Sequence, residues 1–159
     1  MMNRGECFEN PDFVEYVRLL RRLHAMIRSG EDEGAEGDAL RDQMDAPSER
    51  LSSAEVAAVK GIAADFHTLS GESRAPILVD TVESLEVKHA ALAARDAGRW
   101  GEAFESLRRC EPYLSAANVA YLRGAIWLAI GEDDAAHDFL EHAAKLGAIA
   151  PPSAISSRT

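Results

Sequence analysis

The sequence repeats one stretch of helix-forming residues. Residues 98–107 read GRWGEAFESL, and residues 131–140 read GEDDAAHDFL, so that Gly98 aligns with Gly131. The packing positions that follow also match: Ala103 with Ala136, Leu107 with Leu140, and Cys110 with Ala143. A small residue followed by a large one a turn later suits closely packed antiparallel helices. Each half is therefore predicted to be a helical hairpin that turns at its glycine.

The rest of the chain also favours helices. Of the 159 residues, 28 are Ala, which is the best helix former, and the one short β-branched run lies at 76–79. The sequence therefore predicts an all-α fold. We expect an N-terminal helical block packed on a short antiparallel superhelix of two repeats.

Three helices are predicted in the N-terminal block. The first has Asn10 as its N-cap and Pro11 at its first position, and it ends at Ser29-Gly30. The second covers Glu36 to Asp45 and stops before Pro47, because the residue before a proline disfavours the helical conformation. Ile27 of the first helix is predicted to face inward.

The third helix begins with a capping box, in which Ser52 and Glu55 satisfy each other's backbone donors. Its predicted apolar face consists of Val56, Val59, Ile62, Ala63, Phe66 and Leu69. The polar run at 70–73 is the strongest internal boundary. We therefore expect an N-terminal block at 1–71, helical repeats at 72–150 and a disordered tail at 151–159.

Residues 84–150 resemble two tetratricopeptide repeats, a family with a period of about 34 residues. The positions that carry the resemblance are Ala91, Gly98, Ala103 and Leu107 in the first repeat, and Gly124, Trp127, Gly131, Ala136, Leu140 and Ala143 in the second. The first repeat departs from the family pattern, since Ala94 stands where an aromatic residue is usual. Residues 8–69 also resemble a leader block of small uncharacterised bacterial proteins, which implies no function.

The resemblance implies a concave surface, lined by the first helix of each repeat, that takes a peptide or a helical segment of a partner protein. Here that surface would draw on Lys88, Arg95, Asn118, Tyr121 and Arg123, with Leu122 as a further candidate. Asn118 and Arg123 could clamp a partner's backbone or carboxylate. The alternative is that these are ordinary exposed polar residues.

The leading functional hypothesis is thus a non-enzymatic protein–protein interaction module. A small acidic secretion-type chaperone is an alternative with the same repeat type, size and low pI. Two repeats alone bury little surface, so the block at 1–71 is expected to cap them. Trp100 follows a turn glycine and is either an exposed contact residue or a cover for the repeat junction.

Charge narrows the class of partner. With 27 acidic and 17 basic residues the net charge is −10, which argues against nucleic-acid binding and favours a protein partner with basic residues. No apolar stretch approaches the roughly 20 residues that span a bilayer, and no apolar signal segment is seen at the start. A cytoplasmic protein that does not bind membranes is expected, with its oligomeric state left open.

Candidate chemical groups are few. Asp133, His137 and Glu141 follow a spacing of four that could hold a metal, although an exposed polar helix face is the more common meaning. His24 and His67 could face each other, and one could act as a general base. Because no catalytic constellation or phosphate-binding loop is found, we expect no cofactor, no metal and no enzymatic activity. A metal-dependent regulator or enzyme that uses these residues is the remaining alternative.

Overall fold

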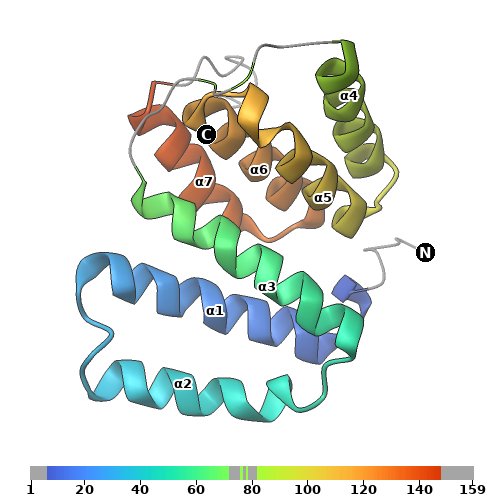
Figure 1. Cartoon of the computed structure of the whole chain (residues 1–159). Coiled ribbons are helices and arrows are strands. Elements are labelled where there is room, and N and C mark those ends of the chain that lie inside the picture. Colours follow the sequence, from blue (N-terminus) through green and yellow to red (C-terminus); the bar gives the residue numbers. More distant parts are fainter. Residues whose placement is uncertain (1–6, 72–75, 77, 79–81, 148–159) are drawn as a thin grey trace. The chain divides into compact units, whose positions relative to one another are not determined.

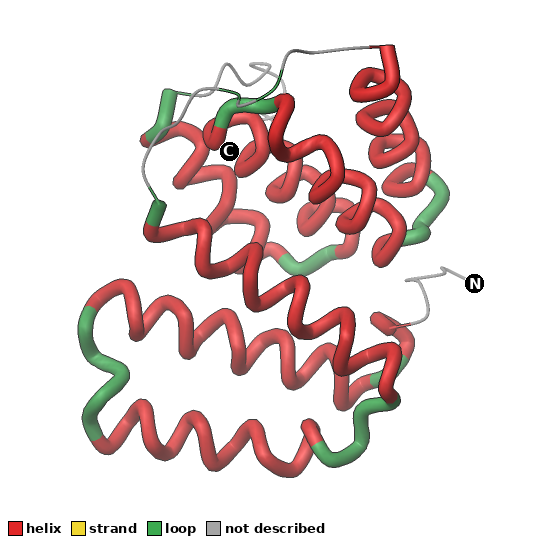
Figure 2. The backbone as a smooth tube through the Cα atoms, viewed as in Figure 1, coloured by secondary structure: helices red, strands yellow, loops and turns green. Residues whose placement is uncertain are grey.

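A computed structural model describes residues 7–71, 76, 78 and 82–147 (Figure 1). Within these residues the chain forms seven α-helices and three short 3-10 helices, joined by loops and turns (Figure 2), so the all-α prediction is confirmed. The chain divides into two compact units, Met1–Gly71 and Glu72–Thr159. The predicted tail at 151–159 lies outside the described residues.

The first unit consists of helices on both sides of a long central one. Its elements are η1 (Cys7–Glu9), α1 (Pro11–Ser29), α2 (Ala35–Ser48), α3 (Ser53–His67) and η2 (Thr68–Ser70). Helix α1 packs against both α2 and α3. Apolar side chains from these helices form the core of the unit; the large buried ones include Phe8, Phe13, Val17, Leu19, Leu20, Leu40, Met44, Ile62, Phe66 and Leu69.

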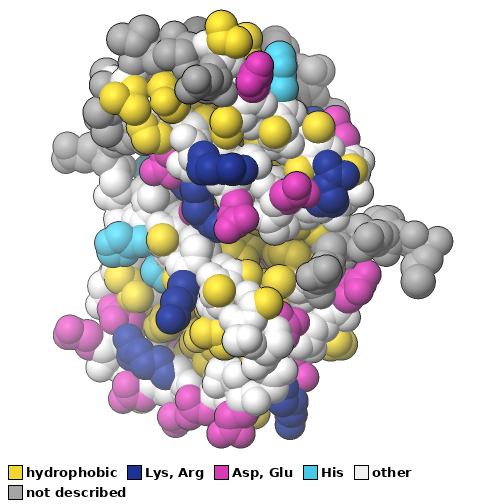
Figure 3. Space-filling view, turned by 45° about the vertical axis from the view of Figure 1, so that its right-hand side comes forward, with side chains coloured by type: hydrophobic (Ala, Val, Ile, Leu, Met, Phe, Trp, Pro, Cys, Tyr) yellow, Lys and Arg dark blue, Asp and Glu magenta, His cyan; other side chains and the backbone are white. Residues whose placement is uncertain are grey.

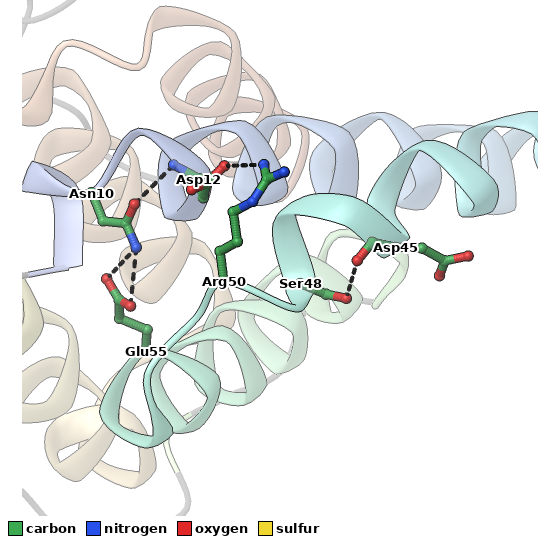
Figure 4. Close-up of polar contacts among 6 residues, drawn as sticks. All are labelled: Asn10, Asp12, Asp45, Ser48, Arg50 and Glu55. Atoms are coloured by element: carbon green, nitrogen blue, oxygen red, sulfur yellow. Dashed lines mark hydrogen bonds and ion pairs between the residues drawn. The ribbon is translucent and has the colours of Figure 1, made fainter.

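One asparagine joins the starts of α1 and α3 (Figure 4). The Oδ1 atom of Asn10 accepts from the backbone N–H of Asp12 at 3.0 Å, and its Nδ2 donates to both carboxylate oxygens of Glu55 at 3.1 Å. Glu55 also accepts from the backbone N–H of Ser52 at 2.8 Å, and Ser52 Oγ accepts from the backbone N–H of Glu55 at 3.2 Å. The predicted N-cap and capping box are confirmed. The Glu55 carboxylate therefore caps α3 and also holds Asn10, the N-cap residue of α1.

The second helix is longer than predicted. It runs to Ser48 and passes through Pro47 instead of stopping at Asp45. Pro47 lies in the last turn, where it forfeits a single backbone hydrogen bond, and its ring is buried. Burial of this apolar ring favours continuation of the helix.

Two apolar side chains of the first unit lie outside the core predicted for them. Val56 is 39% exposed and Ile27 is 43% exposed. Both belong to the apolar face that periodicity predicts for their helix. Val56 follows the buried Glu55 by one position, which is about 100° around the helix, so it lies at the margin of the buried side.

The second unit is built from two helical hairpins. Its elements are α4 (Val82–Asp96), α5 (Trp100–Cys110), η3 (Glu111–Tyr113), α6 (Ala116–Ile130) and α7 (Asp133–Lys145). Helices α4 and α5 pack as one pair, α6 and α7 as the other, and α5 lies against α6. Between α5 and α6 the rings of Phe104 and Trp127 lie 4.9 Å apart, centroid to centroid.

The two hairpins turn in the same way. Gly98 and Gly131 have φ angles of 78° and 96°, in the left-handed region that favours glycine. Each ends its helix with a pair of backbone hydrogen bonds, and the two pairs are separated by the same offset as the sequence repeat. At the first turn the N–H groups of Gly98 and Arg99 donate to the carbonyls of Arg95 and Ala94. At the second turn the N–H groups of Gly131 and Glu132 donate to the carbonyls of Leu128 and Trp127.

Within the second hairpin the helices approach most closely at a glycine. A Cβ atom placed on Gly124 of α6 would lie 2.7 Å from Cγ and Cδ2 of Leu140 in α7, and 3.2 Å from the Leu140 backbone nitrogen. No side chain fits there without moving α7 or the Leu140 side chain. The large residue of one helix thus occupies the space left by the absent side chain of the other.

This contact predicts the effect of enlarging Gly124. We expect Gly124→Leu to lower the free energy of unfolding by about 1–3 kcal/mol, because overpacking forces the two helices apart. Thermal and chemical unfolding of the full chain measure this. Gly101→Leu is the matched control, since Gly101 is also helical but a Cβ there meets nothing within 4 Å. Equal stability of the two variants would contradict the close contact.

Candidate functional site

Helix α6 is apolar on nearly every side, yet only one side is buried. The buried side consists of Ala117, Val119, Ala120, Arg123, Gly124, Ile126, Trp127 and Ile130. On the other side, accessible residues recur at spacings of three and four. Asn118 and Ala129 are exposed, and Tyr121, Leu122, Ala125 and Leu128 are half-buried. We call these six residues the α6 open face. A helix that is apolar all round is normally covered all round, so this accessible apolar strip is unusual.

Three half-buried side chains lie in a line along α4. Lys88, Leu92 and Arg95 are spaced four and three residues apart and are half-buried, and α4 contacts α6 as well as α5. The Arg95 guanidinium forms an ion pair with Asp96, with Nη2 2.9 Å from Oδ1. Of the residues predicted to bind a partner, Lys88, Arg95 and Tyr121 are half-buried and Asn118 is exposed, so all four are accessible to a partner at least in part.

Arg123 does not belong to this surface, contrary to the sequence-based expectation. Only 3% of its side chain is exposed, and its Nη2 donates a hydrogen bond to Glu111 Oε1 in a salt bridge. Arg123 follows Tyr121 by two positions, which is about 200° around a helix, so the two side chains point to opposite sides. The expected clamp of Asn118 with Arg123 is therefore wrong. Leu128, Ala125 and Ala129 were missed, although their spacing from Tyr121 and Leu122 could have identified them.

Buried aromatic rings lie behind the site. Trp100 is 5% exposed, so the alternative that it is an exposed contact residue is wrong. Trp127 and Phe139 are fully buried, and the Arg108 guanidinium lies 5.8 Å above the centre of the Phe104 ring. These rings belong to the core of the second unit and are not available to a partner.

In the first unit the structure brings two histidines together. The rings of His24 in α1 and His67 in α3 lie 6.4 Å apart at 77°, which confirms that they face each other, and His24 also lies 5.9 Å from Phe66. Partial burial lowers the pKa of His24, and the nearby charges of His67 and Arg28 lower it further. His24 therefore favours its neutral form in the folded protein.

The other candidate ligands are engaged at the surface. His137 Nε2 lies 2.9 Å from Glu141 Oε2, and Lys145 Nζ lies 2.9 Å from Glu141 Oε1. The hydrogen bond and charge of Lys145 lower the pKa of the exposed Glu141 carboxyl, with a smaller contribution from His137. Among the described residues, no three or more His, Cys, Asp or Glu side chains gather where they could hold a metal ion. Cys110 is buried and Cys7 is half-buried, and neither forms a disulfide.

No family model, curated protein or solved structure matches this chain. Within the part of the chain that the structure describes, no helix has the length and apolar character needed to cross a membrane.

The histidine pair predicts how stability depends on pH. Because the pKa of His24 is lower in the folded state than its ordinary value of 6.5, the unfolded chain binds more protons between these two values. Stability should therefore fall as the pH drops through 6.5 toward the lowered pKa. Thermal unfolding of the full chain, followed by circular dichroism at pH steps from about 7.5 to about 5, measures this loss.

The control is His24→Gln, which removes the titrating ring and retains its polarity. We expect a shallower pH dependence in this variant. If the wild type and His24→Gln lose the same stability over this range, other groups cause the loss.

Proposed function

We propose that the second unit is a non-enzymatic protein-interaction module that binds a peptide or helical segment of a partner through the α6 open face. The observation that carries this proposal is an accessible apolar strip on a helix whose other side forms the core. Such a strip, with contacts at positions i, i+3, i+4 and i+7, fits the apolar face of an amphipathic helix. Tyr121 supplies a large, stiff contact of the kind that dominates interface energies.

The repeated hairpins support the same proposal. Two hairpins with equivalent turns, at Gly98 and at Gly131, are what a pair of tetratricopeptide-like repeats would have. In that family the first helix of each repeat lines the binding surface, and here those helices are α4 and α6. The proposal therefore places Lys88, Leu92 and Arg95 of α4 beside the strip on α6.

Charge indicates the chemistry of the partner. The chain carries a net charge of −10, and of the two basic side chains proposed beside the strip, Lys88 and Arg95, Arg95 is paired with Asp96. We propose a partner segment with basic residues flanking an apolar face, since complementary fields raise the rate of encounter. Binding should then weaken with added salt, while the apolar contacts persist.

The experiment compares partner capture by matched variants. The immobilised full chain captures proteins from a lysate of its source organism, mass spectrometry identifies them, and the affinity of the captured partner is then measured. We expect Tyr121→Ala with Leu122→Ala to weaken that affinity at least tenfold, or about 1.4 kcal/mol, because both contact side chains are truncated. The melting temperature should change little.

Ala144→Glu, at an exposed position of α7, is the control for a surface change elsewhere and should bind as the wild type does. If the double variant unfolds, the strip is part of the core. If it folds and binds normally, the partner uses another surface.

A further inference from the structure

Two histidines meet at one end of the first unit. His24 lies in the second half of α1, and His67 is the last residue of α3. At the other end of the same two helices, Asn10 of α1 donates to Glu55 of α3. The two helices therefore run in the same direction, and a pair of polar side chains lies at each end of their contact.

The distance between the two rings suits a shared metal ion. The ring centres of His24 and His67 lie 6.4 Å apart. A metal bound to a ring nitrogen at about 2.1 Å lies about 3 Å from the ring centre, so two rings on one ion have centres about 5–6 Å apart. His24 is held beside the Phe66 ring, 5.9 Å away, whereas His67 is exposed. A rotation of the His67 side chain that moves its ring by about 1 Å is enough to complete the site.

The charges around the pair set the strength of such a site. Partial burial lowers the pKa of His24, which favours the neutral imidazole, the form that binds a metal. His67 lies in the last turn of α3, where the carbonyl groups at the end of a helix attract positive charge. The charge of Arg28 acts on His24 in the opposite sense and disfavours a second cation. These surroundings allow a metal ion but do not favour a tight site.

We propose that His24 and His67 form a two-histidine site for a divalent transition-metal ion, with water in the remaining coordination positions. Imidazole is a ligand that Zn²⁺, Cu²⁺ and Ni²⁺ share. Water as the remaining ligand agrees with the finding that, among the described residues, no three or more His, Cys, Asp or Glu side chains gather around one point. With two protein ligands and an arginine nearby, we expect a dissociation constant of about 10–100 μM.

The ion would join two helices at the end opposite to the contact of Asn10 with Glu55. The two ligands come together only when α1 packs on α3, so the ion binds the folded chain and stabilises it. Histidine side chains, in cyan, are seen among the surface groups of the molecule in Figure 3, where dissolved ions reach them. The site lies in the first unit and does not depend on the function proposed for the second.

Thermal unfolding of the full chain with and without Ni²⁺ tests the proposal. At about 1 mM Ni²⁺, which is ten to a hundred times the expected dissociation constant, we expect the melting temperature to rise by about 3–10 °C. His67→Gln should abolish this rise, and since His67 is exposed, it should change the melting temperature little without metal. His89→Gln is the matched control, because His89 is also an exposed helical histidine, and it should retain the rise. No rise in the wild type, or an undiminished rise in His67→Gln, would overturn the proposal.

A second measurement identifies the ligands directly. Ni²⁺ is paramagnetic and broadens the nuclear magnetic resonance signals of the rings that bind it. In a titration of the full chain we expect the ring signals of His24 and His67 to broaden together, at lower Ni²⁺ than those of the other three histidines. In His67→Gln the early broadening of His24 should disappear. If the signals of His24 and His67 broaden no earlier than the other three, the ion binds scattered surface histidines and the proposal is wrong.

Discussion

We infer that the salt bridge between Arg123 and Glu111 fixes the rotation of α6 in the second unit. Arg123 lies in the middle of α6 and is 2% exposed, whereas Glu111 begins the short turn that leads out of α5. A buried guanidinium is costly unless its charge is compensated, so we expect the rotation of α6 that brings Arg123 to Glu111 to be favoured over others. The contact therefore joins one hairpin to the next and sets the direction in which every other side chain of α6 points.

The consequences follow from helical geometry. With Arg123 turned inward, the next residue, Gly124, meets Leu140, and Trp127 one turn later packs on Phe104. Tyr121 and Leu122 are then carried to the open side. The packing of one side of α6 in the core therefore also determines which apolar residues of α6 are left accessible. Along α6, residues that stabilise the fold alternate with residues proposed to bind a partner. The two sets differ in their angle around the helix axis and not in their position along the chain.

Local patterns predicted the parts of the fold that are set by local chemistry. The glycine turns at Gly98 and Gly131 and the capping box at Ser52 depend on backbone geometry within a few residues. The burial or exposure of a side chain depends on residues far away in the sequence, so local patterns did not predict it. Arg123 is of a type usually found at the surface, and it is buried together with a salt bridge to Glu111, a residue outside its own helix that no local pattern identifies. Pro47 is tolerated in the last turn with its ring covered, and Val56 is exposed because it lies at the margin of the buried side of its helix.

The most direct test of this account is a double-mutant cycle on the buried salt bridge. Arg123→Met, Glu111→Gln and the double variant are compared by chemical unfolding of the full chain. Because the two side chains are in contact and one of them is buried, we expect a coupling energy of about 1–3 kcal/mol, with each single variant clearly destabilised. Additive effects, within about 0.5 kcal/mol, would contradict the claim that this pair sets the orientation of α6.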